Sequence, residues 1–358
     1  MSVTKKPLEG KVILVTGGTG SMGKTFVRRA LSGVHGNPKK VIVMSRDEGK
    51  QHYMRQDYLN RQGSTDEVIY NNFQRALEFQ IGDVRRYEDV CAALHGVDIV
   101  VNAAALKQVP VCEYFPEQAV LTNCAGVSNI VRAIRDFKFP VDTVVGVSTD
   151  KACKPVNVMG MTKAIQERIF ISGNLQCPDT RFVCVRYGNV LASRGSVIPL
   201  FHDQIKKGGP ITITDPNMTR FLLSLEQAVD TVLAAIEHGH RGELFVPRVP
   251  SANIINIAKA LIGDRKIELK ITGIRPGEKL HEALLSDEES PRSYRNGDYY
   301  VLQPMLPELC AQPRASDLIG EYSSRDYVLN EKDTYQLLEK FNMLLPVDES
   351  PEKFELVG

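Results

Sequence analysis

An acidic and a basic residue, Asp150 and Lys151, stand side by side directly after a β-branched run at 142–148. Thr149 precedes the pair, and Lys163 follows near the start of a helical pattern. An adjacent acid and base can do general acid–base chemistry when their surroundings move their pKa values apart. An isolated pair of this kind is usually a surface ion pair, so the surrounding elements must decide between the two interpretations.

A glycine-rich turn follows the first apolar run of the chain, which spans 11–18 and precedes a helical pattern. The spacing G-x-x-G-x-x-G suits a tight turn whose backbone approaches a pyrophosphate at a helix N-terminus. Strand, turn and helix together predict a dinucleotide site. Its candidate residues are Thr16, Gly17, Thr19, Gly20, Ser21, Met22 and Gly23.

The end of the second predicted strand carries Ser45, Arg46 and Asp47. An acid at this place usually binds the ribose hydroxyls of NAD, whereas an arginine with small donors suits the 2′-phosphate of NADP. Ser45 and Arg46 fall at the strand end and favour NADP, while Asp47 keeps NAD as the alternative. After the third strand, Asp83 and Val84 are placed to meet the adenine.

Strand-like runs alternate with helical patterns over the first 190 residues, which is typical of a parallel, doubly wound sheet. After residue 190 the strands become shorter, and beyond 291 the proline-rich, aperiodic chain predicts loops and short helices. The predicted strands of the first part are 11–18, 40–45, 77–83, 97–105, 142–148 and 181–188, and its longer helices are 116–137 and 159–172.

The predicted fold is therefore α/β, with a Rossmann-type cofactor domain over 1–190. A smaller, partly discontinuous α/β domain for the substrate is expected over 191–330. Residues 331–358 are expected to form a C-terminal tail, and some later segments to return to the first domain.

The composition excludes several classes of function. The formal net charge is +1, from 44 basic and 43 acidic residues, which argues against nucleic-acid or membrane binding. No run approaches the ~18 apolar residues of a membrane span, and the start lacks a secretory signal. Seven scattered cysteines without C-x-x-C spacing predict reduced thiols in a cytoplasmic protein and no metal site.

The glycine turn, Asn102-Ala-Ala-Ala105, Ser148-Thr149 and Lys163 resemble the extended short-chain dehydrogenase/reductase family. That family normally carries Tyr-x-x-x-Lys, in which the tyrosine exchanges a proton with a sugar hydroxyl. Here Met159 stands at the tyrosine position. A thioether cannot exchange a proton, so this chain departs from the family pattern at its central residue.

Further blocks resemble the UDP-N-acetylglucosamine 4,6-dehydratases. These blocks lie at 105–110, 148–152, 186–189, 193–199, 215–221 and 275–279. Methionine at the tyrosine position resembles the branch with configuration-retaining and capsule-sugar enzymes, which leaves the C5 configuration of the product open.

The resemblance implies a cycle in which a hydride leaves C4 for the nicotinamide, water is lost across C5 and C6, and the hydride returns to C6. It implies that Lys151 is the C5 base, Asp150 the acid for the C6 hydroxyl and Thr149 the partner of the C4 oxygen. Lys163 would bind the nicotinamide ribose. With Met159 in place, Asp150 or a water must also accept the C4 hydroxyl proton.

The resemblance also implies further binding residues. To the cofactor site it adds Ala103, Ala104, Lys107, Asn123, Tyr187 and Asn189. A UDP-sugar diphosphate needs N–H groups and arginine forks, for which the candidates are Asn189, Arg194 and Arg220. Other substrate candidates are Arg275 and Glu278 for UDP, Thr214 for uracil, Val197 and Pro199 for the base pocket, and Lys107 for the sugar.

UDP-N-acetylglucosamine is thus the expected substrate. The protein is expected to be a homo-oligomer, and the predicted helices 116–137 and 159–172 are its candidate dimer surfaces. A UDP-sugar 4-epimerase, a dehydratase that also epimerises C5 or C3, and a non-catalytic NADP-binding sensor are the alternatives. Asp150 and Lys151 favour dehydration, because 4-epimerisation needs no C5 base. The missing tyrosine is the best argument for the sensor.

Overall fold

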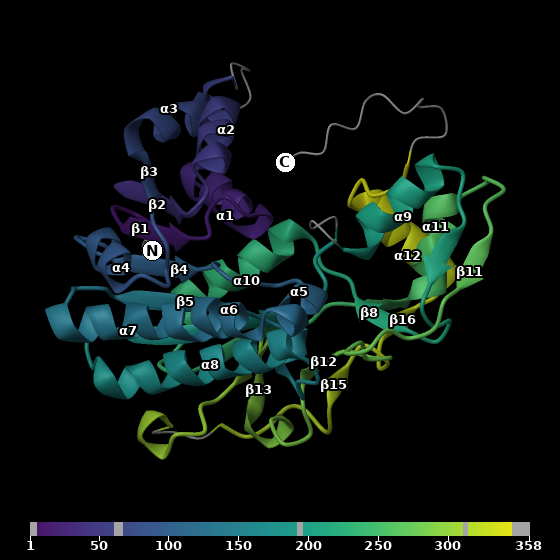
Figure 1. The fold of residues 1–358 in the computed structure, drawn as a ribbon. Helices are drawn as coiled ribbons and strands as arrows, with labels where there is room; N and C mark the ends of the chain where they lie inside the picture. Colours follow the sequence, from purple (N-terminus) through teal and green to yellow (C-terminus); the bar gives the residue numbers. More distant parts are fainter. Residues whose placement is uncertain (1–5, 61–66, 192–195, 311–313, 346–358) are drawn as a thin grey trace, which may run out of the picture.

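The computed structural model describes residues 6–60, 67–191, 196–310 and 314–345 (Figure 1). Its largest element is a nine-stranded sheet in the order β13-β14-β9-β6-β5-β4-β1-β2-β3. The strands from β3 to β9 pair in parallel, and β14 and β13 follow antiparallel at one edge. These strands are β1 (Val12–Thr16), β2 (Lys40–Ser45), β3 (Leu77–Ile81), β4 (Ile99–Asn102), β5 (Thr143–Thr149), β6 (Arg181–Tyr187), β9 (Leu244–Pro247), β13 (Ser293–Asn296) and β14 (Tyr299–Leu302).

Helices cover both faces of this sheet. Contacts group α4 and α8 with α7 on one face, and α3 and α10 with α1 on the other. Every residue of β1 is buried, as expected for a strand between two helical layers. These helices are α1 (Ser21–Leu31), α2 (Glu48–Leu59), α3 (Glu67–Ala76), α4 (Tyr87–Ala93), α7 (Gly126–Phe137), α8 (Val158–Gln176) and α10 (Leu225–His238). The predicted α/β class with a doubly wound parallel sheet is confirmed.

A second group of elements packs beside the carboxyl ends of the parallel strands (Figure 1). It has its own apolar core, which includes Phe201, Ile257, Leu261 and Leu338. Its helices are α9 (Val197–Lys206), α11 (Ile254–Ile262) and α12 (Glu331–Lys340), and its strands are β7 (Ile211–Ile213), β8 (Thr219–Phe221), β10 (Ser251–Asn253), β11 (Leu269–Ile271) and β16 (Val328–Leu329). A separate two-stranded sheet of β12 (Ala283–Leu285) and β15 (Tyr322–Ser323) packs against the core of the main sheet.

The structure differs from the prediction of loops and short helices beyond residue 291. β13 and β14 form a hairpin closed by Gly297 and Asp298, and β14 pairs with β9 at the edge of the main sheet. Gly297 has φ +58°, the left-handed value that a two-residue hairpin turn requires. Gly297-Asp298 is therefore a hairpin signal in the sequence, and the prediction missed it because the segment around it is rich in proline.

The expected tail over 331–358 is also partly wrong. Residues 331–340 form the helix α12, with Asn330 as its N-cap, and α12 packs on α11. The predicted helix over 116–137 is interrupted. It consists of α6 (Pro116–Val120), a π-helical turn over Leu121–Ala125, and α7. A π turn shifts the direction of its side chains around the helix axis, which matters for Asn123 below.

Candidate active site

A cavity of about 1400 Å³ lies along the carboxyl ends of the parallel strands and extends to the second group of elements. Because β1, β2, β4, β5 and β6 run in parallel, the residues that follow them meet at this edge. Nearly all the predicted site residues line the cavity. The exceptions are Thr16 and Asn123, which lie behind its wall, and Arg194, which falls outside the described residues.

Thr16 and Asn123 were predicted to contact the cofactor, and the structure corrects both. The Thr16 hydroxyl donates to Asn102 Oδ1 at 2.6 Å inside the core. The Asn123 amide bonds to both backbone polar groups of Leu106 and to the Thr162 hydroxyl. The π turn directs Asn123 into this network, so that it holds the loop after β4 against α8. Each residue positions the cavity wall.

The glycine turn has the geometry of a dinucleotide cradle. Gly17 adopts φ +66°, and a Cβ there would lie 2.7 Å from the Ala104 backbone nitrogen. A Cβ on Gly23 would lie 2.6 Å from the Gly18 Cα, so α1 can pack against the turn only with glycine at that place. Gly20 is the N-cap of α1 and offers no side chain to its N–H groups. The helix N-terminus is thus available to a phosphate.

The far end of this cradle is lined by Ser45, Arg46, Asp47 and Lys50. The Asp47 carboxylate caps α2 by accepting from the Lys50 N–H at 2.9 Å, and it pairs with the Lys50 ammonium at 2.6 Å. These contacts lower the pKa of Asp47. Arg46 is half exposed, with Asp83 as a partner at 3.8 Å. The acid that would bind ribose hydroxyls is therefore engaged by its own helix, while cations face the cavity.

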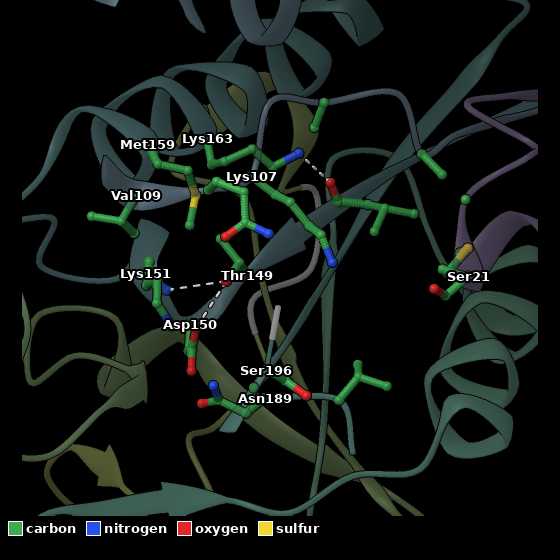
Figure 2. Close-up of a pocket in the computed structure, with 18 of the residues that line it drawn as sticks. Ser21, Lys107, Val109, Thr149, Asp150, Lys151, Met159, Lys163, Asn189 and Ser196 are labelled. Carbon is green, nitrogen blue, oxygen red and sulfur yellow. Dashed lines mark hydrogen bonds and ion pairs between the residues drawn. The ribbon is translucent and has the colours of Figure 1, made fainter. Parts of the chain in front are cut away.

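The adjacent acid and base form a buried cluster with a carboxylate from far along the chain. Lys151 Nζ lies 3.1 Å from Asp150 Oδ1 and 3.3 Å from Glu282 Oε1. Asp150 is 1% exposed and Glu282 3% exposed. The Thr149 hydroxyl donates to Asp150 Oδ1 at 2.8 Å, as Figure 2 shows. The pair is therefore not a surface ion pair.

This cluster determines the charge on Lys151. Burial lowers the pKa of the Lys151 ammonium, but Asp150 and Glu282 outweigh that effect and raise it above its ordinary value. Among the described residues, Asp150 Oδ2 and Glu282 Oε2 are buried without a hydrogen-bond partner. The cluster thus holds a protonated amine and two carboxyl oxygens that are free to accept or carry protons.

Lys163 lies on the other side of the cavity, at the level of the β5 carbonyls. Its ammonium donates to Val147 O and to Gln166 Oε1, both at 2.6 Å. Burial lowers its pKa to about 8. An ammonium of this kind keeps a third N–H for a ligand in the cavity that it lines.

Met159 is both packed and site-lining. It is 5% exposed, clusters with Cys112 and Ala119, and its thioether points into the space above Thr149 in Figure 2. The following residue is Gly160, where a Cβ would clash with the Lys151 carbonyl oxygen. The start of α8 thus packs directly on the Thr149–Lys151 segment and leaves no titratable group at position 159.

The opposite wall suits an anion. Arg220 is 8% exposed, and its guanidinium donates to the carbonyl oxygens of Thr219, Lys279 and Leu280. No ion pair of Arg220 occurs within the described ranges. Asn189 Oδ1 and Ser196 Oγ line the same cavity and are buried without a hydrogen-bond partner there. The buried Arg220 guanidinium and the Ser196 hydroxyl can donate to a diphosphate, whereas Asn189 Oδ1 can only accept.

Arg275 and Glu278 form a short turn above this wall, in which the Arg275 N–H donates to Glu278 Oε2 at 3.3 Å. The Asn157 side chain donates to Gly277 O at 2.9 Å and so ties the turn to the start of α8. Thr214, Val197 and Pro199 also line the cavity beside α9. The roles predicted for these residues stay predictions.

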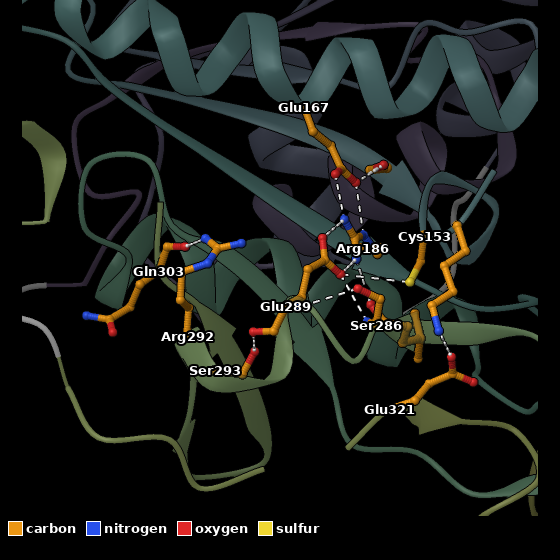
Figure 3. A network of polar contacts seen from close by, with 12 residues as sticks. Cys153, Glu167, Arg186, Ser286, Glu289, Arg292, Ser293, Gln303 and Glu321 are labelled. Carbon is orange, nitrogen blue, oxygen red and sulfur yellow. Dashed lines mark hydrogen bonds and ion pairs between the residues drawn. The ribbon is translucent and has the colours of Figure 1, made fainter. Parts of the chain in front are cut away.

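Glu282 is the residue that sequence reasoning missed. It stands just after the Arg275–Lys279 block and before β12, and nothing local distinguishes it from a surface glutamate. Its segment is brought to the cluster by a buried ion triad, shown in Figure 3. The Arg186 guanidinium pairs with Glu167 of α8 and with Glu289, both at 2.7 Å, and donates to Leu284 O.

The Rossmann-type sheet, with its glycine turn and a cavity along the carboxyl ends of its strands, has the architecture of nucleotide-sugar epimerases and dehydratases. A family model described as "Polysaccharide biosynthesis protein" matches residues 13–304, and the chain belongs to that family. This chain is 47% identical to a Rickettsia conorii protein named UDP-glucose 4-epimerase over 295 residues. The matched region covers 81% of this chain and 82% of the relative. A Rickettsia massiliae protein of the same name is 46% identical over 295 residues, again 81% of this chain and 82% of the relative.

Solved structures share the fold. The X-ray structure of Pen from Bacillus thuringiensis superposes with a TM-score of 0.84 at 31% identity, over 94% of this chain and 99% of that one. DesIV, a dTDP-glucose 4,6-dehydratase from Streptomyces venezuelae solved with NAD and TYD, gives 0.64 at 20% identity, over 85% and 92%. The second likeness concerns the fold alone.

Proposed function

We propose that the protein dehydrates UDP-N-acetylglucosamine to a UDP-4-keto-6-deoxy sugar, as a lyase that recycles NADP. The observation that carries this proposal is the buried cluster of Asp150, Lys151 and Glu282 at the end of β5, with Thr149 beside it. Water loss across C5 and C6 needs a base and an acid beyond C4 oxidation. A buried cluster with one amine and two carboxyl groups supplies both.

The cradle around Gly17 and Gly23 supports a nicotinamide dinucleotide, and Ser45, Arg46 and Lys50 support a 2′-phosphate on it. Asp47 is engaged in capping α2, which argues against NAD. When bound, the nicotinamide supplies a temporary store for the C4 hydride until it is needed at C6. Lys163, with its lowered pKa and free N–H, is placed to bind the adjoining ribose.

Asp150 can replace the missing tyrosine. The Thr149 hydroxyl already donates to Asp150 Oδ1. A C4 hydroxyl beside Thr149 passes its proton through this hydroxyl to Asp150, and Asp150 then gives that proton to the departing C6 hydroxyl. One carboxyl group thus takes and returns the same proton, and Met159 needs only to fill space. Lys151 is placed to take the C5 proton, and it must first lose the proton it holds.

The anion-binding wall supports a UDP-sugar as substrate. Arg220, Asn189 and Ser196 would bind the diphosphate, and Arg275 and Glu278 the UDP ribose and phosphate. The remaining candidates would line the base pocket and the sugar site: Thr214, Val197, Pro199 and Lys107. Lys107 also lines the cavity, which is compatible with a contact to the sugar.

A UDP-sugar 4-epimerase is the second candidate, because the curated relatives at 45–47% identity carry the name UDP-glucose 4-epimerase. Simple 4-epimerisation needs a group that exchanges a proton at the C4 oxygen and a sugar that rotates in the site. It makes no use of a base at C5 or an acid at C6. The buried Lys151 cluster therefore favours dehydration.

The decisive test incubates the purified protein with UDP-N-acetylglucosamine or UDP-glucose, without added cofactor, and follows the mass of the sugar nucleotide. Loss of one water supports the dehydratase. An unchanged mass with inversion at C4 supports the epimerase. An unchanged sugar in both reactions, repeated with NADP added, favours the non-catalytic sensor and overturns the proposal.

We also propose that the protein is a cytoplasmic homodimer or larger oligomer that pairs through α6 and α8. Large apolar side chains are exposed there, with Val120, Met161 and Ile165 at 47%, 47% and 50%. Among the described residues no helix is both long and apolar enough to cross a membrane. Analytical ultracentrifugation of the protein tests the assembly, and Ile165→Glu should shift it toward the monomer.

A further inference from the structure

Glu282 gives Lys151 a second carboxylate. Its backbone is fixed from two sides, because its N–H donates to Ser324 Oγ at 3.0 Å and its carbonyl accepts from the Ser324 N–H at 2.8 Å. The side chain lines the cavity and is 3% exposed. Within the described residues its one polar contact is Lys151 Nζ at 3.3 Å, and its Oε2 is buried without a partner.

The position of Glu282 relative to the cavity matters. The Lys151 side chain is 22% exposed and the Glu282 side chain 3% exposed, so Lys151 is the more accessible of the two from the cavity that both line. Asp150 bonds to the same ammonium from the other side and is also bonded by the Thr149 hydroxyl. Asp150 is thus connected to the proposed C4 and C6 proton transfers, whereas the Glu282 carboxylate, as far as the described part of the chain goes, contacts only Lys151.

A C5 base must carry a lone pair, yet two buried carboxylates hold Lys151 as an ammonium. Asp150 cannot remove that proton, since it receives the C4 hydroxyl proton in the proposed cycle. Glu282 can, because it already lies within proton-transfer distance. When a sugar closes the cavity and expels water, a neutral amine beside a neutral carboxylic acid avoids two buried charges.

We propose that Glu282 is the proton acceptor of Lys151: it takes one ammonium proton while the sugar is bound, so that the neutral amine can abstract the C5 proton. A Lys151 N–H bond breaks and a Glu282 O–H bond forms, and the freed lone pair then takes the C5 proton. Lys151 later returns a proton to C5, and Glu282 returns its proton to Lys151. Glu282 is therefore a positioning residue that acts through Lys151, and this role rests on the proposed function.

The test is Glu282→Gln, which keeps the shape and every backbone bond but removes the acceptor. C5 exchange from deuterated water is measured by mass spectrometry between pH 6 and about pH 10, with UDP-N-acetylglucosamine as probe. At pH 7 we expect exchange to fall about 100-fold. We expect it to recover about tenfold per pH unit as bulk base deprotonates Lys151, while wild-type exchange stays nearly independent of pH.

Two further variants separate this role from loss of structure. Glu282→Asp keeps a carboxylate and should retain pH-independent exchange at a reduced rate. Glu243→Gln is the matched control, since Glu243 is also buried but bonds to Tyr294 and His240 at the far edge of the sheet. It should leave exchange unchanged.

Undiminished exchange in Glu282→Gln, or a loss that is equal at every pH, overturns the role of Glu282. If the wild-type chain still loses water from the sugar in the same experiment, the proposed function stands even though the role of Glu282 is overturned. A wild-type chain that loses no water overturns both the proposed function and this inference.

Discussion

The side chain of Asn157 joins the start of α8 to the turn at Arg275–Glu278. Its Oδ1 accepts from the Gly160 N–H at 2.8 Å and caps α8, while its amide nitrogen donates to Gly277 O at 2.9 Å. Met159 and Lys163 of α8 line the cavity, as do Arg275 and Glu278, which flank Gly277. One residue therefore fixes the spacing between the two halves of the site.

Asn157→Ala should weaken substrate binding more than the chemical step. The loss of the Gly277 bond frees the turn, and one hydrogen bond of about 1 kcal/mol corresponds to about a fivefold higher KM for the UDP-sugar. The lost cap should also cost about 1 kcal/mol of stability. Asn330→Ala, which removes the cap of α12, is the control: it should lose similar stability with KM unchanged. Equal KM values in Asn157→Ala and Asn330→Ala would show that the Asn157–Gly277 bond does not support substrate binding.

Lys151→Ala should abolish exchange of the C5 proton with deuterated water, because it removes the amine that takes that proton. Turnover should fall by at least about 100-fold. Lys154→Ala serves as control, since Lys154 is a nearby lysine that pairs with Asp287 and Glu321 outside the cavity. Exchange at the wild-type rate in Lys151→Ala would remove this lysine from the base role.

Arg46→Ala should weaken NADP binding by about 10- to 100-fold, as expected for a lost charge-assisted hydrogen bond to phosphate of about 1.5–3 kcal/mol. NAD binding should change little, because NAD lacks the 2′-phosphate. Isothermal titration of both cofactors measures the difference, and Arg135→Ala on α7 is the control. An equal loss for NADP and NAD would contradict a phosphate role for Arg46.

Lys163 should make the stability of the cofactor-free protein rise with pH. Burial lowers its pKa from 10.5 to about 8 in the folded state, so between these values the unfolded chain binds more protons than the native one. Stability therefore rises as the pH goes from about 8 to 10.5, by up to about 3 kcal/mol. Urea unfolding of the wild type and of Lys163→Met measures this contribution as the difference between the two pH profiles.

Lys163→Met has no such group and should show a flatter profile over that range. Lys259→Met, which removes an exposed lysine paired with Glu331, is the matched control and should follow the wild type. If stability changed with pH in the same way in the wild type and in Lys163→Met, burial of the charged Lys163 would not destabilise the native state, and the prediction would be wrong.

Local signals in the sequence predicted the parallel sheet and the glycine turn well. The glycine turn and the buried β-branched strands depend on short-range demands, namely backbone space at Gly17 and Gly23 and burial on both sheet faces. The parallel order then brings the residues after each strand to one edge. This is why Thr149, Asp150, Lys151 and Lys163 could be placed at one site from sequence alone.

What the tertiary structure alone decided depends on contacts between segments far apart in the chain. The π turn directs Asn123 to Leu106, and Thr16 turns into the core toward Asn102, so neither meets the cavity. No periodicity predicts that Glu282 meets Lys151, because the Arg186 ion triad, and not a local pattern, brings β12 to β5. The sequence determined which chemical groups are present, and long-range packing determined which of them lie within hydrogen-bond distance of one another.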